Sequence, residues 1–331
     1  MNGGIIHLYN EPRIISSACV VGNEEHIGPL GDLFDGYSSD PRFGMKTWES
    51  AESEMQRRAF LYALKKGSVK CEDISAVFAG DLQNQCVAST YGLLPYNAPY
   101  IGLYGACSTL AEGLVLSSML IDSKKLCTVA VSASSHFCAA ERQFRFPLEY
   151  GSQRPPTAQR TVTAAGTFIL SQSGADIRIC DVLIGRICDS GISDISNMGA
   201  AMAPAAADTL CRYFAQSQKR PSDFDLILTG DLGYEGIKIL KDLCFAKGLD
   251  LSGNLNDCGL LIYSASEQDV HAGGSGCGCS AAVMSGYIMK RLKDKTLKNI
   301  LLMCTGAMMS PTSLLQGQSI PSIAHLVHIR G

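Results

Sequence analysis

Short apolar runs alternate with longer segments that have helical spacing, and most apolar runs end in polar or glycine-rich residues. Residues 14–21 (IISSACVV) and 126–136 (LCTVAVSASSH) are typical of strands that are buried on both faces. Residues 48–66 carry apolar side chains at helical spacing and stop before Gly67, a common helix terminator. This alternation predicts an α/β fold with parallel sheets and right-handed crossovers.

The second half of the chain repeats the order of elements in the first half. A strand that ends in Gly-Asp-Leu occurs at 74–82 (ISAVFAGDL) and again at 223–232 (DFDLILTGDL). A loop with glycine and cysteine then leads into a helix, as GACS at 105–108 in the first half and GGSGCGCS in the second. The repeat predicts two similar α/β halves, 1–172 and 173–331, each with a five-stranded sheet and with the two cysteine-loop helices between them.

Composition excludes several classes of protein. The 331 residues are 46% hydrophobic with a formal net charge of −3 and no continuous basic run, so we expect neither nucleic-acid binding nor a polybasic membrane anchor. No apolar stretch is long enough to span a membrane, and we expect no signal peptide. The 14 cysteines lack the pattern of a disulfide scaffold or a zinc site, which favours a cytoplasmic protein with reduced thiols and no bound metal.

Cys107 is the first candidate for chemistry, because GACS places it where a loop enters a helix. Free amides and the helix dipole favour negative charge there, and such a cysteine can act as a nucleophile. The competing interpretation is a small buried apolar residue, which describes most free cysteines. His136 and His325 are expected at strand ends, where a histidine either serves a site or acts as a hydrogen-bonded spacer.

Ten stretches between about residues 10 and 329 resemble a known family, and the most specific are ERQFRFPLEYG (141–151) and AGGSGCGCSA (272–281). They resemble the thiolase and ketoacyl-synthase superfamily and, within it, the stage V sporulation protein AD (SpoVAD) family of spore-forming bacteria. The resemblance implies a thiolase-like fold with duplicated α/β halves in a five-layer αβαβα arrangement. It also implies a protein that binds dipicolinic acid, pyridine-2,6-dicarboxylate, and takes part in its uptake into the developing spore.

Comparison with the enzymes of that superfamily argues against catalysis. Cys107 matches their nucleophile, but 230–232 (Gly-Asp-Leu) stand where they carry a histidine or asparagine motif. Residues 273–276 lack the histidine of the thiolase Gly-His-Pro loop, and Cys304 is only similar to the second thiolase cysteine. The resemblance therefore implies a non-catalytic homologue. The alternatives are an acyl-thioester transferase or condensing enzyme with Cys107 as nucleophile and His136 or His325 as base, and a purely structural partner of a membrane complex.

The ligand site implied by the resemblance is centred on Cys107. We expect the following residues to bind the ligand: Cys107, His136, Arg142, Arg145, Asp257, Cys258, Ser275 and His325. Dipicolinate carries two carboxylates, which need compensation from the helix start and arginines, or from calcium carried with the ligand. We expect the free acid rather than its calcium chelate, no other cofactor, and a Cys107 that remains a neutral thiol.

The resemblance also implies partners and a location. We expect a cytoplasmic protein that is peripheral to the spore inner membrane and is held there by membrane proteins of the same sporulation operon. Thiolases are typically dimers through the sheet edge near the helix of the nucleophile, so a homodimer is expected by the same resemblance.

Overall fold

The computed structural model describes residues 3–144 and 153–331. The strands of the first half are β1 (Ile6–His7), β2 (Arg13–Val21), β3 (Gly36–Tyr37), β4 (Ala76–Gly80), β5 (Tyr100–Leu103), β6 (Thr128–Ser135), β7 (Arg160–Thr161) and β8 (Ala164–Ser171). Those of the second half are β9 (Arg178–Leu183), β10 (Leu226–Thr229), β11 (Leu255–Asp257), β12 (Gly274–Ser275), β13 (Asn299–Ala307) and β14 (Ser322–Arg330).

The helices follow the predicted alternation with the strands. The first half has α1 (Asn23–His26), α2 (Trp48–Gly67), α3 (Val87–Leu93), α4 (Thr109–Asp122) and α5 (Phe137–Phe144). The second half has α6 (Met198–Ser217), α7 (Gly233–Phe245), α8 (Cys258–Leu261), α9 (Cys277–Val283), α10 (Met289–Lys293) and α11 (Pro311–Leu315). A π-helical turn, Met284–Ile288, joins α9 to α10.

Two groups of five strands with the same topology form one continuous sheet. Its path is β11-β10-β13-β14-β9-β2-β8-β6-β4-β5, with β1 and β3 attached at the side, and β7 pairs separately with β12. In the first group β4 is parallel to β5 and β6, and β8 is antiparallel to β2 and β6. In the second group β10 is likewise parallel to β11 and β13, and β14 is antiparallel to β9 and β13. The predicted duplication is therefore confirmed, but the prediction of parallel sheets is wrong in part, because β8 and β14 run antiparallel to their neighbours. The boundary at residue 172 remains a prediction, and that residue lies in the loop between β8 and β9.

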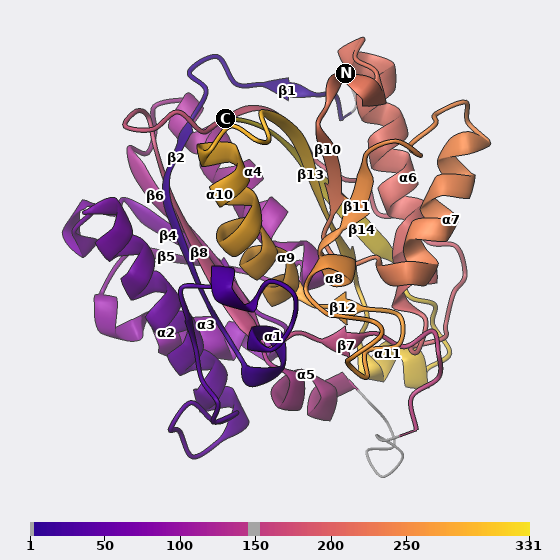
Figure 1. The fold of residues 1–331 in the computed structure, drawn as a ribbon, viewed down its shortest axis with the longest axis horizontal. Helices are drawn as coiled ribbons and strands as arrows, with labels where there is room; N and C mark the ends of the chain where they lie inside the picture. The colour runs from indigo at the N-terminus through magenta and orange to yellow at the C-terminus, as the bar shows by residue number, and fades with distance from the viewer. Residues whose placement is uncertain (1–2, 145–152) are drawn as a thin grey trace.

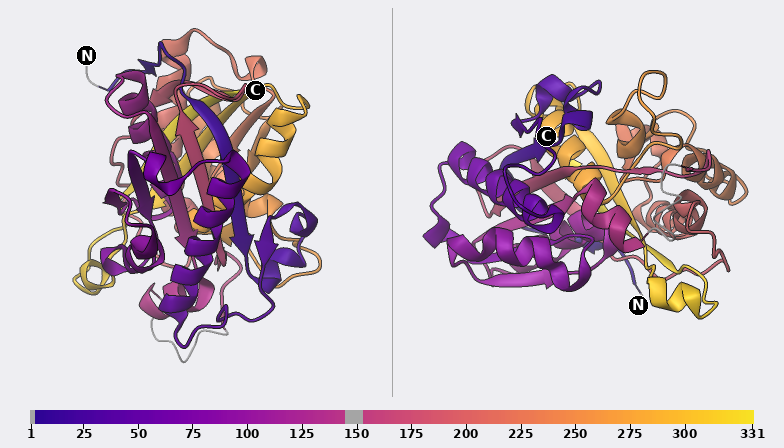
Figure 2. Two further views of the ribbon diagram at one scale, coloured as in Figure 1. Left: turned by 90° about the vertical axis from the view of Figure 1, so that its left-hand side faces the viewer. Right: turned by 90° about the horizontal axis from the view of Figure 1, so that it is seen from below.

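The helices form three layers around the two halves of the sheet (Figures 1 and 2). Helices α2 and α3 cover the outer face of the first half, whereas α6 and α7 cover that of the second. Between them, α4 contacts β6 as well as β13 and β14, and α9 contacts β6 and β8. The helices and the two halves of the sheet thus form the five-layer αβαβα arrangement.

None of the helices in the described part of the chain is long and apolar enough to cross a membrane.

Local sequence explains where α2 begins and ends and why α9 packs closely on the sheet. Thr47 caps α2 in a reciprocal arrangement with Ser50, and Ser68 ends the helix in the left-handed conformation at φ 52°. Every residue of α9 is buried, and a Cβ at Gly278 would lie 2.3 Å from the carbonyl oxygen of Ala164. The glycine in the CGC motif therefore permits close packing of α9 on the sheet.

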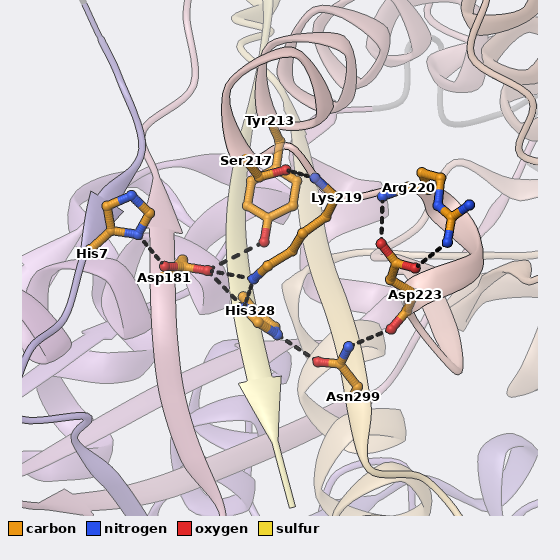
Figure 3. A network of polar contacts seen from close by, with 9 residues as sticks. All are labelled: His7, Asp181, Tyr213, Ser217, Lys219, Arg220, Asp223, Asn299 and His328. Atoms are coloured by element: carbon orange, nitrogen blue, oxygen red, sulfur yellow. Dashed lines mark hydrogen bonds and ion pairs between the residues drawn. The ribbon is translucent and has the colours of Figure 1, made fainter.

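A polar network ties the N-terminal strand to the second half (Figure 3). Asp181 Oδ1 lies 2.6 Å from His7 Nδ1, and Asp181 Oδ2 lies 2.8 Å from His328 Nδ1 and 3.2 Å from Lys219 Nζ. Burial alone would raise the pKa of Asp181, but the hydrogen bonds from His328 and His7 and the charge of Lys219 hold it well below its ordinary value. Asp181 is thus a charged, fully partnered residue.

Candidate functional site

A cavity of about 710 Å³ lies beside Cys107 and is lined by both halves of the chain. Cavities of this size commonly hold small molecules. Residues of the first half and of the segment that follows α5 line it together with residues of the second half. They include Leu82, Asn84, Tyr104, Cys107, Glu141, Phe144, Gln153, Arg154, Gln159, Thr161, Asp194, Ser196, Met198, Met202, Ser275, Ala307, Met308 and Met309.

Cys107 lies in a short 3-10 turn, Ala106–Ser108, that leads directly into α4, as the GACS motif predicted. Ala106 has a φ of 51°, a left-handed backbone that costs a non-glycine residue about 1 kcal/mol. The turn is closed by the amide of Ser108, which donates to the carbonyl oxygen of Gly105 at 3.1 Å. The chain therefore holds Cys107 at the cavity wall in a fixed backbone conformation.

Asp231 is the buried polar centre of the site. Its Oδ2 accepts hydrogen bonds from Ser275 Oγ at 3.0 Å and from the amide of Gly276 at 2.8 Å. Its Oδ1 accepts one from Thr305 Oγ1 at 3.1 Å. Burial raises the pKa of Asp231 above its ordinary value, although these donors oppose the shift. One carboxyl group thus links the turn after β10, the loop before α9 and strand β13.

The thiol of Cys107 faces this centre, with Sγ 4.0 Å from Ser275 Oγ. Burial raises the pKa of Cys107 well above its ordinary value, and the nearby charge of Asp231 raises it further. Burial and the neighbouring carboxyl group of Asp231 therefore favour a protonated thiol at neutral pH. Of the predicted ligand-binding residues, the structure brings Cys107 and Ser275 together in the cavity wall.

Two side chains after α5 complete the cavity wall with unused hydrogen-bonding capacity. Gln159 Nε2 donates to the carbonyl oxygens of Asp231 at 2.8 Å and Gly274 at 2.9 Å, while its buried Oε1 has no partner among the described residues. The side chain of Arg154 is 7% exposed, and its Nη2 lies 2.6 Å from Asp269 Oδ2. Its buried Nη1 likewise has no partner in the described part of the chain.

The two predicted histidines lie outside the cavity lining. His136 Nε2 donates to the carbonyl oxygen of Pro41 at 2.8 Å, and burial lowers the pKa of this imidazole. His325 Nδ1 accepts from the amide of Gly185 at 3.2 Å, and burial lowers the pKa of His325 to about 4. Both are therefore neutral spacers in the structure, and no histidine is found among the described residues that line the cavity.

Of the remaining predicted residues, Arg142, Asp257 and Cys258 do not line the cavity either. Arg142 pairs with Glu49 and lines a separate hollow of about 250 Å³, and Arg145 lies outside the described residues. Asp257 accepts hydrogen bonds from Thr229 Oγ1 and from backbone amides of the turn after β10, and burial raises the pKa of Asp257 to about 7. Cys258 is fully buried in the core. Arg142 and Asp257 thus have structural partners within the protein.

Asp231, Gln159 and Arg154 belong to the site, although they are not among the residues expected from the sequence to bind the ligand. The repeated Gly-Asp-Leu turn drew attention to Asp231, but its partners Ser275 and Thr305 lie far along the chain. Met308 and Met309 also line the cavity, and Met308 is 40% exposed. The described residues contain no group of three side chains suited to holding a metal ion.

Comparisons with known proteins agree with this geometry. The chain matches the family model for stage V sporulation protein AD (SpoVAD) over residues 4–330. The stage V sporulation protein AD of Bacillus subtilis (strain 168) is 42% identical over 319 residues, which cover 96% of this chain and 94% of that protein.

Solved structures of low sequence identity share the fold. The 3-oxoacyl-(acyl-carrier-protein) synthase III from Aquifex aeolicus VF5 has a TM-score of 0.59 at 11% identity and covers 97% of this chain and 100% of its own. Cerulenin-bound OleA from Xanthomonas campestris has a TM-score of 0.62 at 11% identity and covers 97% of each chain. The chain therefore belongs to the stage V sporulation protein AD family of sporulation proteins and has a thiolase-like fold.

Proposed function

We propose that this protein binds dipicolinate in the cavity beside Cys107 and takes part, without catalysis, in the uptake of dipicolinate into the developing spore. The observation that carries the proposal is Arg154 in the cavity wall. Its guanidinium is almost fully buried, and one of its terminal nitrogens has no partner within the described residues. A buried guanidinium with free N–H groups favours a carboxylate, because its planar fork matches the two oxygens.

The charge state of the other site groups supports an anionic ligand. A buried dianion is costly unless nearby groups are neutral or positive. Burial raises the pKa of the Cys107 thiol well above its ordinary value, which favours the uncharged thiol, and burial also raises the pKa of Asp231 above its ordinary value. The start of α4 adds a partial positive charge from its free amides. The thiol thus shapes the cavity without adding a negative charge.

The ligand in this proposal is the free acid. Glu141 and Asp194 also line the cavity, and their carboxylates are the groups that a calcium ion accompanying the ligand would prefer. The described residues, however, contain no group of three ligands for a metal ion. Binding that persists in the presence of a chelator supports the free acid as the ligand. Binding that requires calcium would instead identify the calcium chelate as the ligand.

Calorimetric titration with dipicolinate in chelator tests the proposal. Arg154→Met should weaken binding about tenfold or more, because a charge-assisted hydrogen bond is lost. Arg142→Met is the matched control, since Arg142 pairs with Glu49 outside the cavity. Asp269→Asn separates loss of the ligand contact from loss of the Arg154–Asp269 pair. No measurable binding, or equal losses for the two arginine variants, would overturn the proposal.

The competing function is acyl transfer with Cys107 as nucleophile. Its supporting observation is the position of the thiol in the wall of a cavity, in a fold shared with synthases. Against it stand the raised pKa of Cys107 and the lack of a histidine among the described lining residues. Incubation with acetyl-CoA followed by intact-protein mass spectrometry distinguishes the two. Acylation of Cys107 with turnover would favour the transferase.

The proposed setting is the cytoplasmic side of the spore inner membrane, with membrane proteins of the same operon as partners and with a homodimer as the working unit. Strand β5 ends the sheet path, and exposed Tyr100 and Ile101 lie on it. An unpaired edge with apolar side chains favours pairing with a second copy. Light scattering should report a dimer for the native chain and a monomer for Ile101→Lys. A native monomer at micromolar concentration would refute this part.

A further inference from the structure

One continuous helix connects the candidate site to a basic surface. The segments α9, the π-helical turn and α10 run from Cys277 to Lys293 in the central layer. The helix begins directly after Ser275 and Gly276, at the polar centre of the site. At about 1.5 Å per residue it extends roughly 25 Å from there. Figure 1 shows α10 beside the C-terminus, while α5 and α11, which border the cavity, lie at the opposite end.

The far end of this helix and the loop after it carry a concentrated positive charge. We call it the α10 basic patch, and it consists of Lys290, Arg291, Lys293, Lys295 and Lys298, all exposed. Asp294 is the one acidic residue among residues 290–298, so the segment has a formal charge of five minus one, or +4. The whole chain has a formal charge of −3. The fold therefore presents a cationic surface on an acidic protein.

Internal contacts leave most of that charge available. Lys290 Nζ donates to a backbone carbonyl oxygen, that of Leu33, and keeps its charge. Lys295 lies 4.0 Å from Asp176, and both side chains are largely exposed, so water weakens this pair. The ammonium groups of Lys293 and Lys298 have no hydrogen bond or ion pair within the described residues, although the carboxylate of exposed Asp225 accepts a hydrogen bond from the backbone amide of Lys298 at 2.7 Å. Two of the five cations thus face solvent without any partner there.

Helix capping accounts for only part of the patch. Cations in the last turn of a helix are stabilised by the helix dipole, and this explains Lys290, Arg291 and Lys293. Lys295 and Lys298 lie beyond the helix, where the dipole gives no such benefit. The apolar residues of the segment offer no exposed anchor for a partner protein, because Met289 and Leu292 are buried and Leu297 is partly buried against the core. A protein interface of high affinity normally needs apolar or aromatic anchors at its centre.

We propose that the α10 basic patch adsorbs electrostatically to an anionic lipid surface and orients the protein with its cavity end away from the bilayer. The exposed side chains of the patch are cationic or polar, which suits a layer of anionic headgroups. Because no apolar side chain of the patch is available for insertion, the attachment is reversible and sensitive to salt. The proposal does not depend on which ligand occupies the cavity.

Vesicle flotation of the full chain tests this adsorption. At low salt the protein should float with vesicles of phosphatidylcholine mixed with phosphatidylglycerol, stay unbound with phosphatidylcholine alone, and dissociate as salt is added. The double variant Lys293→Glu with Lys298→Glu should bind at least about tenfold less, because each basic residue near such a surface strengthens binding about fivefold.

The matched control is Lys241→Glu with Lys247→Glu, which makes the same charge change at two exposed positions on and after α7. It should keep most of the vesicle binding. Equal losses in the two double variants, or no preference for the anionic vesicles, would overturn the proposal, and so would capture by an acidic protein without any vesicle binding. Dipicolinate titration of both variants should give native affinity, which separates this result from the test of the cavity.

Discussion

The two halves of the molecule carry the same Gly-Asp turn, yet the two aspartates have different surroundings. Asp81 after β4 accepts hydrogen bonds from the amide of Ser89 at 2.8 Å and from its hydroxyl at 2.7 Å, within the first half. Asp231 after β10 binds Ser275 and Thr305, which come from two other elements, and faces the thiol of Cys107. The same local motif thus stabilises a turn in one half and organises a cavity wall in the other.

The two cysteine-loop helices also differ, but here the copy in the first half lines the cavity and the copy in the second half is buried. Cys107 before α4 lines the cavity, whereas Cys277 at the start of α9 is fully buried and donates to the carbonyl oxygen of Ser134 at 2.9 Å. The site therefore takes its helix start from the first half and its aspartate turn from the second. The duplication gives the chain two copies of each motif, and in the folded protein one copy of each motif contributes to the site.

The largest expected difference is in stability. In Asp81→Asn the new NH2 group must face a backbone N–H, from Gln83 on one side or Ser89 on the other. We expect a loss of about 2 kcal/mol in the free energy of unfolding. In Asp231→Asn the NH2 group can donate to Thr305 Oγ1, so the loss should stay below about 1 kcal/mol. Denaturant unfolding of both variants measures the two losses in the free energy of unfolding. Equal losses would contradict the proposed difference between Asp81 and Asp231.

The next prediction concerns pH, because Asp81 has an acidic neighbour. Burial raises the pKa of Glu52 to about 8, and the charge of Asp81 adds to the shift. The folded state therefore keeps a proton that an unfolded glutamate loses near pH 4. This contribution to stability is complete below about pH 4 and is lost as pH rises toward about 8. Glu52→Gln cannot lose the proton and should flatten the decline, gaining about 1 to 2 kcal/mol relative to wild type near pH 8.

Asp181 provides a control of opposite sign. Its pKa is held below the ordinary value, so its contribution is present above about pH 4 and is lost as pH falls through the lower folded pKa. Asp181→Asn should therefore reduce stability at neutral pH and lose its effect in acid. Unfolding curves at a series of pH values separate the two groups. A Glu52→Gln curve parallel to that of the wild type would contradict the assignment.

A smaller effect should separate Cys107 from Cys277 by reactivity. Exposed Cys127 supplies the reference rate for alkylation by a maleimide. We expect Cys107 to react much more slowly than Cys127 because burial raises its pKa, and buried Cys277 not to react in the folded protein. Peptide mapping after timed quenching gives the three rates. Protection of Cys107 by dipicolinate would place the ligand at the thiol, while a Cys107 rate above that of Cys127 would refute the neutral thiol.

The smallest effect is expected for Cys107→Ser. A hydroxyl group replaces a neutral thiol of similar size next to Ser275, so the affinity for dipicolinate should change by less than about threefold, or 0.6 kcal/mol. Cys107→Ala should lose slightly more because the polar group is removed. A large loss with serine would show that the sulfur itself has a chemical role, and it would favour the transferase.

Local patterns were sufficient to predict the order of elements, the duplication and the position of Cys107 at a helix start. They could not decide the direction of a side chain at a strand end. Asp257 ends β11, and because β11 pairs with β10 its carboxylate binds the turn after β10. His136 follows β6 and points to the carbonyl oxygen of Pro41, which is remote in sequence. Such contacts depend on the packing of distant segments.

The charged residues of the site were the hardest to predict. Several arginines lie within α5 and in the polar segment after it, and their local sequence does not distinguish Arg154 from Arg142. Only the fold buries Arg154 beside Asp269 and leaves exposed Arg142 paired with Glu49. The α10 basic patch was missed because leucine, aspartate and threonine interrupt its cations along the chain.

The interlocked central layer has a consequence for synthesis on the ribosome. Strands β6 and β8 are covered on their inner face by α9, which belongs to the second half. After Ser171 completes the last strand of the first half, more than 100 residues must still be made before α9 is finished at Val283. At typical translation rates this takes roughly ten seconds. During that interval the nascent chain exposes an apolar sheet face, which makes it a natural client for a ribosome-associated chaperone.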